Sequence, residues 1–308
     1  MATNTSFTGN YAGEKAVGYL APAILAANTI ANGGVTVHDN IRYKLNVRNL
    51  ATTGFLADAT CDFSATGNVN LSDVVLEPKE LQMNIELCKK DFQSQWEALE
   101  MRGRLLDQEI PASFEDFFIN HILTLLAKDV ETYMWTGTAS SGQFAGYQSL
   151  LAADSAVVDV VGTTITAANV FAELAQVVDA IPNAVYTQDD FRIYIPIKTA
   201  KLFQRALGYG QLTATPNYIN SYNNQLVVGS KPLDFEGIPL FVANGLGDNK
   251  MVAARASDLH FGTNVMTDMN EVRIIDMAQY DGSQNVRFVA RLTAGTQITN
   301  GSNIVYYA

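Results

Sequence analysis

The chain has 308 residues, 48% of them hydrophobic, and its 31 acidic and 20 basic side chains give a formal net charge of −11. A chain this long buries about three quarters of its unfolded surface and is expected to form about two domains without disulfide or metal staples. Because it contains no run of Lys or Arg, the composition argues against sequence-specific nucleic-acid recognition.

The first 34 residues are small, polar and punctuated by glycine, which is typical of an extended arm that cannot bury enough surface to order itself. Within this arm residues 16–31 are apolar, but they include Pro22 and are preceded only by Lys15. We therefore expect neither a signal peptide nor a membrane-spanning helix here.

Residues 35–47 alternate between apolar and polar side chains, with Asp39 as the one break in the pattern. This period of two predicts a strand of 13 residues that spans ~43 Å, about twice the usual length. Residues 81–88 alternate in the same way and are expected to return as its antiparallel partner. The two segments predict a long two-stranded ribbon within residues 35–92.

The residues between these strands, 49–70, have a weak pattern and are too many for a loop inside a compact domain. A ribbon that projects from the body removes this difficulty. A two-stranded ribbon is marginal in water, so its tip should pack on another surface, which we expect to be a second copy of the chain. The candidate interface residues at the tip are Phe55, Leu56, Cys61 and Phe63.

A long amphipathic helix is predicted next, over residues 111–135. Pro111 precedes it, Ser113 is the expected N-cap, and Glu115 and Asp116 lie in the first turn, where the helix dipole favours acidic groups. Its length would be ~34 Å, about twice that of an average helix. The predicted apolar stripe consists of Ile119, Leu123, Leu126, Val130 and Met134.

Three glycines follow this helix, at Gly137, Gly142 and Gly146, and glycine-rich loops can bind phosphate. A phosphate loop leaves a strand and opens a helix, whereas this segment leaves a helix and is expected to lead into a strand or turn. It also lacks the Lys followed by Ser or Thr that closes a P-loop. The segment is therefore interpreted as a mobile hinge and not as a cofactor site.

The rest of the chain has an α/β pattern followed by strands. We expect helices at 167–181 and at 197–207, the second closed by Gly208, and strands at 191–195, 238–244 and around 250–261. Residues 270–298 predict two strands joined by a turn at Asp281 and Gly282. One face of the last strand carries Val286, Phe288, Ala290 and Leu292.

Residues that would carry catalysis or metal binding are not grouped in this sequence. His38, His121 and His260 have no ligand-spaced companion, and Cys61 and Cys88 form no CxxC motif. Nucleophile, zinc and phosphate-loop motifs are absent. We therefore expect no catalytic, cofactor or metal site and free thiols in a reducing cytoplasm. The acidic residues interpreted as solvated turn carboxylates, with acid–base or cation roles as the alternative, are Asp189, Asp190, Asp268, Glu271 and Asp276.

The order of these parts resembles the major capsid protein of tailed bacteriophages, with its HK97-like shell fold. The resemblance rests on residues 135–151, on "IYIPIKTAKLF" and "FEGIPLFVANGL", and above all on residues 258–298. It implies an α+β fold in five parts. These are an N-terminal arm (1–34), an E-loop ribbon (35–92), a P-domain with a long spine helix (93–150), an α/β A-domain (151–265), and returning P-domain strands with the C-terminus (266–308).

The resemblance also implies a function. Such proteins assemble as hexamers and pentamers into an icosahedral shell around a double-stranded DNA genome, without sequence-specific DNA binding, enzyme activity, cofactor or membrane. The expected partners are further copies of the chain, a scaffolding protein, a portal and in some shells a decoration protein. The expected location is the virion capsid, and the host cytoplasm during assembly.

Two features depart from some members of that family. Only a short arm precedes the ribbon, which implies a separate scaffolding protein or a mature chain. Residues 49–70 contain no lysine, so a covalent crosslink from the ribbon tip is not expected. Two alternatives stay open from sequence: an encapsulin-like compartment that encloses protein cargo, and an α/β enzyme with a cleft in residues 150–265.

Overall fold

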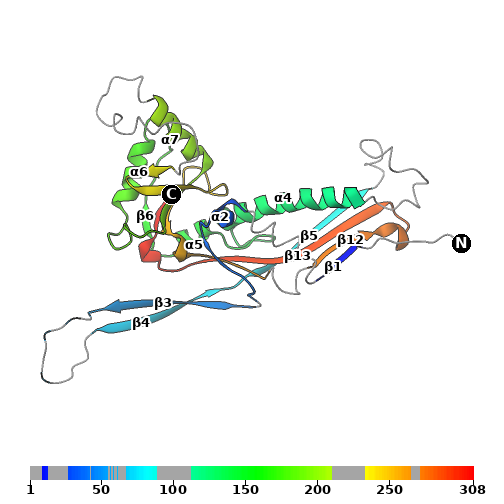
Figure 1. Cartoon of the computed structure of the whole chain (residues 1–308), viewed down its shortest axis with the longest axis horizontal. Helices are drawn as coiled ribbons and strands as arrows, with labels where there is room; N and C mark the ends of the chain where they lie inside the picture. The colour runs from blue at the N-terminus through cyan, green and yellow to red at the C-terminus, as the bar shows by residue number, and fades with distance from the viewer. Residues whose placement is uncertain are drawn as a thin grey trace.

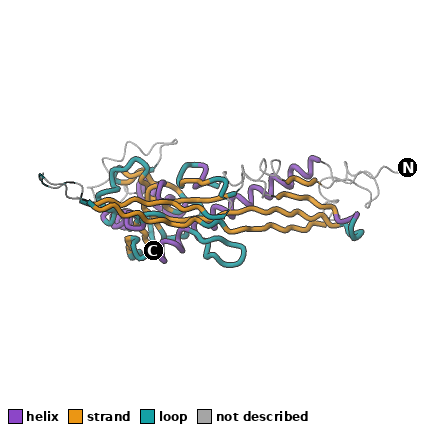
Figure 2. Tube along the Cα trace, turned by 90° about the horizontal axis from the view of Figure 1, so that it is seen from below, coloured by secondary structure: helices purple, strands orange, loops and turns teal. Residues whose placement is uncertain are grey.

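The structure is a computed structural model that describes residues 9–12, 27–41, 43–54, 56, 58, 61, 67–88, 112–209, 233–264 and 271–308. Three parts are visible in Figure 1: a long sheet with helix α4 lying along it, an α/β lobe that contains the C-terminus, and a two-stranded ribbon that projects from the body. The strands of the long sheet follow the long axis of the molecule (Figure 2). The body is therefore elongated, as expected from the long predicted elements.

The long sheet is built on β13 (Asn285–Ile298), which has 14 residues and a mostly alternating burial pattern. β5 (Lys79–Cys88) pairs antiparallel with one edge of β13. Along its other edge lie β12 (Glu271–Asp276) and β11 (Leu259–Thr263), which follow one another in line. β1 (Gly9–Ala12) pairs with β12, and β2 (Thr36–His38) pairs with β11 in parallel. The predicted apolar face of the last strand is confirmed, because Val286, Phe288, Ala290 and Leu292 are all buried.

Helix α4 (Ala112–Thr136) has 25 residues and shares a hydrophobic core with this sheet. It begins at Ala112, one residue before the predicted N-cap at Ser113. Its buried side chains include four of the five predicted stripe residues, whereas Leu123 is only partly buried and Ile122 takes part instead. The 3.6-residue period therefore located the helix correctly and misplaced one position of its apolar face.

The end of the predicted arm is part of this core. Helix α2 (Asn28–Ala31) packs against α4, with Ala27 and Ile30 buried. The Thr29 N–H and Oγ1 donate to the buried Glu131 carboxylate at 2.9 and 2.5 Å, and Trp135 Nε1 donates to Thr29 Oγ1 at 3.0 Å. Hydrogen bonds to Glu131 thus order a segment whose composition alone predicts no order.

The α/β lobe contains a second sheet in the order β6-β14-β10-β7-β9-β8. Helices α6 (Val170–Asp179) and α7 (Ile197–Tyr209) pack in its core. Gly208 lies inside α7 and does not end it, contrary to the prediction. The strands are β6 (Val158–Val160), β7 (Phe191–Ile195), β8 (Asp234–Phe235), β9 (Ile238–Val242), β10 (Met251–Arg255) and β14 (Val305–Tyr307).

The chain crosses between the two sheets more often than expected from an A-domain at 151–265 followed by P-domain strands at 266–308. β10 lies in the lobe sheet and β11 in the long sheet, with the 3-10 turn η1 (Ala256–Asp258) between them. After β13 the 3-10 turn η3 (Gly301–Asn303) leads to β14, which returns to the lobe sheet. The two crossings come together, because the Thr299 N–H donates to the Asp258 carbonyl at 2.9 Å.

The predicted ribbon exists, but its strands differ from the expected ones. It is formed by β3 (Leu45–Thr53) and β4 (Asn68–Leu76), which pair antiparallel along their whole length. The predicted strand 35–47 is interrupted after β2 by a turn with Asn40 at a φ of 64°. Residues 81–88 belong to β5 on the long sheet, so their predicted pairing with 35–47 is wrong. Alternation reports that one face of a strand is buried and does not identify its partner.

The glycine segment after α4 is an anchored turn, not the mobile hinge predicted. Gly146 N donates to Gly137 O at 2.8 Å, and a Cβ on Gly137 would lie 2.2 Å from Phe144 O. Lys79 Nζ donates to three carbonyl oxygens of this turn, those of Ala139, Ser140 and Gln143. Helix α5 (Tyr147–Ala153) follows, so the predicted strand or turn at this place is also wrong.

No helix among the residues described here is both long and apolar enough to span a membrane.

Candidate functional site

The projecting ribbon exposes apolar side chains on one of its faces. Alternate residues of a strand share a face, so Val69, Leu71 and Val75 of β4 lie on one side of the ribbon. Val69 is 55% exposed, Leu71 62% and Val75 41%. We call these three β4 residues the ribbon outer face. A two-stranded sheet with an apolar face in water is marginal alone, so this face is suited to contact another surface.

Two of the predicted interface residues, Leu56 and Cys61, are described between β3 and β4 of the same ribbon. Leu56 is 98% exposed and Cys61 is exposed with a free thiol. Phe55 and Phe63 lie outside the described residues. The interface at the tip stays a prediction. Sequence inspection missed the ribbon outer face, because the predicted loop 49–70 covered the start of β4 and no strand was predicted for its remaining residues.

Both legs of the ribbon are fixed to the body over Gly262 of β11. Ile41 precedes β3 and Leu76 ends β4, and both side chains are buried. A Cβ at Gly262 would lie 2.7 Å from Ile41 Cδ1 and 2.8 Å from Leu76 Cδ2. Only glycine leaves room for both legs at this position, so Gly262 defines the base of the ribbon.

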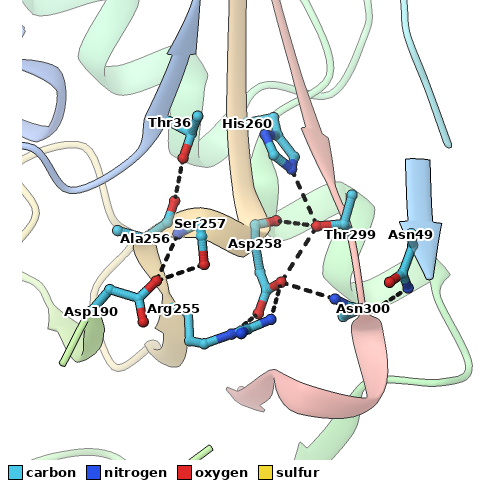
Figure 3. Close-up of polar contacts among 10 residues, drawn as sticks. All are labelled: Thr36, Asn49, Asp190, Arg255, Ala256, Ser257, Asp258, His260, Thr299 and Asn300. Atoms are coloured by element: carbon cyan, nitrogen blue, oxygen red, sulfur yellow. Dashed lines mark hydrogen bonds and ion pairs between the residues drawn. The ribbon is translucent and has the colours of Figure 1, made fainter. Parts of the chain in front are cut away.

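Hydrogen bonds from the sheet junction also hold the ribbon. Gln297 Nε2 of β13 donates to Val75 O of β4 at 2.9 Å. Asn49 Nδ2 of β3 donates to Asn300 Oδ1, and Asn300 Nδ2 donates to Asp258 Oδ1 at 3.2 Å (Figure 3). Asn300 has a φ of 51°, in the left-handed region that Asn tolerates better than most residues.

A buried ion pair lies at the centre of this junction. Arg255 donates to both Asp258 carboxylate oxygens, from Nε at 2.7 Å and from Nη2 at 2.8 Å, and the Asp258 side chain is 2% exposed (Figure 3). The hydrogen bond to Asp258 raises the pKa of Arg255. Nearby, Ser257 Oγ donates to Asp190 Oδ2 at 2.6 Å. These contacts join β10, η1 and the end of β13 to the ribbon.

Two of the three histidines meet at the ribbon base. His38 Nε2 and His260 Nδ1 are 2.9 Å apart, and His260 Nε2 lies 3.2 Å from Thr299 Oγ1. Burial and then the neighbouring His38 lower the pKa of His260 to about 4, against an opposing effect of Asp258. Burial also lowers the pKa of His38, against an opposing effect of Asp39. The residues are 222 positions apart, so no spacing in the sequence indicates this contact.

The other sequence candidates are not brought together. His121 is exposed on α4. Asp190 binds Ser257, Asp276 accepts from Ala278 N at 3.0 Å, and Asp268 lies outside the described residues. Within the part of the chain that the structure describes, no three His, Cys, Asp or Glu side chains are grouped in a way that would hold a metal ion.

Comparisons with known proteins place this architecture among shell proteins. No protein-family model matches the chain, and no curated protein matches it in sequence. Solved structures do match. The capsid of the native GTA particle has 14% identity and a TM-score of 0.59, and the match covers 92% of this chain and 89% of that one.

Two further structures have different sources. For the satellite phage P4 procapsid that includes the size determination (Sid) protein, the identity is 11% and the TM-score 0.57, with 100% of this chain and 92% of that chain covered. For the virus-like particle from Pyrococcus furiosus, the identity is 12% and the TM-score 0.51, with 96% and 99% covered. At these identities the similarity is one of fold. The predicted α+β, HK97-like shell fold is confirmed.

Proposed function

We propose that this chain is the major capsid protein of a tailed bacteriophage. Many copies would assemble as hexamers and pentamers into an icosahedral shell around double-stranded DNA. The proposal rests on the ribbon outer face, three exposed apolar side chains on an element that projects from the body, with the Asp73–Arg48 ion pair on the same side. A shell fold over 92% or more of the chain in the structures compared above supports it.

The contacts of such a shell would be individually modest. Full burial of one Leu or Val side chain is worth roughly 1.5–3 kcal/mol before the entropy of ordering is subtracted. Each copy in a closed shell makes several interfaces at once, so small contacts accumulate through multivalency. We propose that the tip residues Phe55, Leu56, Cys61 and Phe63 extend the same interface beyond the ribbon outer face.

We further propose a separate scaffolding protein, a portal and assembly in the host cytoplasm. The inclusion of a size determination protein in the P4 procapsid supports the proposal of an additional assembly partner. The acidic net charge of −11 suits enclosure of DNA without specific binding. Decoration of the outer surface is compatible with this arrangement.

A structural role also accounts for the polar residues of the α/β lobe. The buried Glu173 carboxylate accepts hydrogen bonds from Tyr307 Oη and Thr163 Oγ1, both at 2.6 Å, and so fastens the C-terminal strand to α6. The polar groups of this cluster are hydrogen-bonded to one another. The alternative of an α/β enzyme therefore gains no support from this cluster.

The compartment shell is the second candidate, because the virus-like particle from Pyrococcus furiosus has a comparable fold. Nothing in the described residues favours it over the capsid. The nucleic-acid and protein content of particles purified from the natural source would separate the two: packaged DNA supports the capsid, and an enzyme cargo supports the compartment.

The test of the proposed interface is Leu71→Glu, with Asn70→Glu as its matched control. Both residues are exposed and adjacent on β4, but they lie on opposite faces of the ribbon. A buried unpaired carboxylate costs several kcal/mol, so Leu71→Glu should reduce shell yield by at least about tenfold while the subunit stays folded. Normal particles from Leu71→Glu, or equal loss in both variants, would exclude the ribbon outer face as an interface.

A further inference from the structure

The His38–His260 contact depends on how many protons the two rings carry. An imidazole nitrogen without hydrogen accepts and one with hydrogen donates, so the pair at 2.9 Å needs one hydrogen between the facing nitrogens. The centroids of the two rings are 5.0 Å apart, which is close to the largest separation possible when the nitrogens are in contact. The rings therefore contact each other edge to edge, through these nitrogens, and are not stacked. If both rings are protonated, both facing nitrogens carry hydrogen and two positive charges adjoin. The contact is then lost.

This pair lies where the ribbon leaves the body. His38 is the last residue of β2, an edge strand of three residues whose one sheet partner is β11. After His38 the chain turns at Asn40 and then leads into β3. Between them, Ile41 N donates to Thr263 O at 3.2 Å. In the register of β2 with β11, His38 is opposite Gly262, the residue over which both ribbon legs pack. Loosening of β2 would therefore free one leg of the ribbon at its base.

The charged groups around the pair come from three places. Asp39 follows His38 in the chain and favours its protonation, and Asp258 of η1 does the same for His260. Arg255 of β10 binds both Asp258 oxygens and so offsets its charge. Lys44 lines the same pocket as His38 and pairs with Glu77 at 2.9 Å. Two neutral groups also contact His260: Thr299 on its far ring nitrogen, and Tyr147 Oη, which donates to its carbonyl at 2.9 Å. Among the described residues, neither imidazole is hydrogen-bonded to a carboxylate.

We propose that the His38–His260 contact is an acid-sensitive latch that holds β2 on β11 in neutral solution, and that protonation of both rings releases it and lets the ribbon change its angle to the body. The second leg keeps its contact through Gln297, and Asn49 of the first leg keeps its hydrogen bond to Asn300, so the ribbon pivots and does not detach. Such a latch would give the chain two ribbon orientations selected by pH.

The direction of the pH effect follows from the lowered pKa values. In the latched state the pKa of His260 is about 4, whereas a released histidine returns toward its ordinary 6.5. The released state therefore binds more protons at low pH. The free-energy preference for the latched state is fully present above pH 6.5 and decreases as the pH falls toward 4. One titrating group changes this equilibrium by at most about tenfold per pH unit.

The test is hydrogen–deuterium exchange of the unassembled full-length chain at pH 7.5 and 5.0, with exchange times corrected for the intrinsic rate. These pH values lie about one unit or more on either side of the ordinary pKa of histidine. We expect protection of β2 and of the ribbon base to fall at least about tenfold at the lower pH. Strand β7 in the lobe, the internal reference, should keep its protection. Unchanged protection at the ribbon base, or equal loss in β7, would overturn the latch.

The decisive variant is His38→Gln, with His121→Gln as the matched control. A glutamine amide has both a donor and an acceptor, so it can face His260 in either protonation state without titrating. The loss of protection at the ribbon base between pH 7.5 and 5.0 should be at least about threefold smaller in His38→Gln than in the wild type, a change within the single-group limit of about tenfold per pH unit. In His121→Gln the loss of protection should equal that of the wild type. A wild-type response in His38→Gln would refute the proposal.

A second measurement covers the case in which His38→Gln does not fold. Side-chain NMR of the wild-type histidines reports their protonation directly. The latch requires His260 to titrate below 6.5, and a His260 that titrates above this value would overturn it. Neither measurement uses shells, so the outcome is independent of the proposed capsid function.

Discussion

Asp258 joins more segments at the ribbon base than its position in a short 3-10 turn suggests. Its carboxylate binds Arg255 and Asn300, and Asn300 in turn binds Asn49 of the ribbon. A buried carboxylate is tolerated when every oxygen has partners, and the loss of one partner leaves a charge without compensation. The ion pair is therefore expected to matter more for stability than ion pairs on the surface.

We predict that Asp258→Ala lowers the free energy of unfolding by about 3–5 kcal/mol, because Arg255 is left without its partner. The matched control is Asp248→Ala, whose bridge to Lys198 at 3.2 Å joins two exposed side chains. It should cost at most about 1 kcal/mol. Urea unfolding measures both, and equal losses in the two variants would contradict the role given to Asp258.

Gly262→Ala tests the packing of the ribbon legs. The added methyl group would push Ile41 and Leu76 apart, and such overpacking typically costs about 1–3 kcal/mol. We expect faster hydrogen exchange at the ribbon base as well as lower stability. Gly162→Ala, which meets the Tyr307 ring in the lobe, is the control and should destabilise the chain without changing the ribbon base. Unchanged, slow exchange at the ribbon base in Gly262→Ala would contradict the role given to Gly262 in packing the ribbon legs.

Single residues were predictable where local chemistry decides their role. The alternating face of β13 and most of the α4 stripe follow from burial of one side of a regular element. The histidine pair and the ion pair at the ribbon base do not, because the first joins residues 222 positions apart and the second depends on where η1 turns the chain. Long-range contacts of this kind have no signal in one sequence.

At the scale of elements, the ribbon contributes least to the core of its own chain. β4 is exposed along most of its length, whereas β5 alternates between exposed and partly buried residues on β13. The sequence predicted a ribbon and misassigned its strands, since the polar residues of β4 on both faces resemble a loop. An element that is exposed on both faces lacks the periodicity by which strands are recognised.

We predict that deletion of residues 51–67 leaves a soluble, folded subunit that builds no regular shells. The deleted range includes the last residues of β3, and none of its described side chains belongs to the buried core. Thermal unfolding should change by no more than a few degrees, because surface changes away from buried groups are usually within about 0.5 kcal/mol. Regular particles from the deleted chain would show that the tip is dispensable.

The whole molecule has a shape that its own contacts do not explain. A long sheet with one covering helix, a separate lobe and a projecting ribbon together expose more surface than a compact chain would (Figure 1). The presence of a ribbon, the long helix and this extended outline could be predicted from sequence, because they follow from the lengths of periodic segments. The strand partners and the sheet crossings could not, because they depend on pairing between distant segments.

We expect many copies of this chain to form a closed shell. Electron microscopy of the purified full-length protein, alone and with a scaffolding protein supplied, tests it most directly. We predict closed icosahedral particles or capsomers in which the ribbon of one subunit, with Val69, Leu71 and Val75, lies against its neighbour. A protein that stays a compact monomer under both conditions, or particles in which this face contacts nothing, would contradict it.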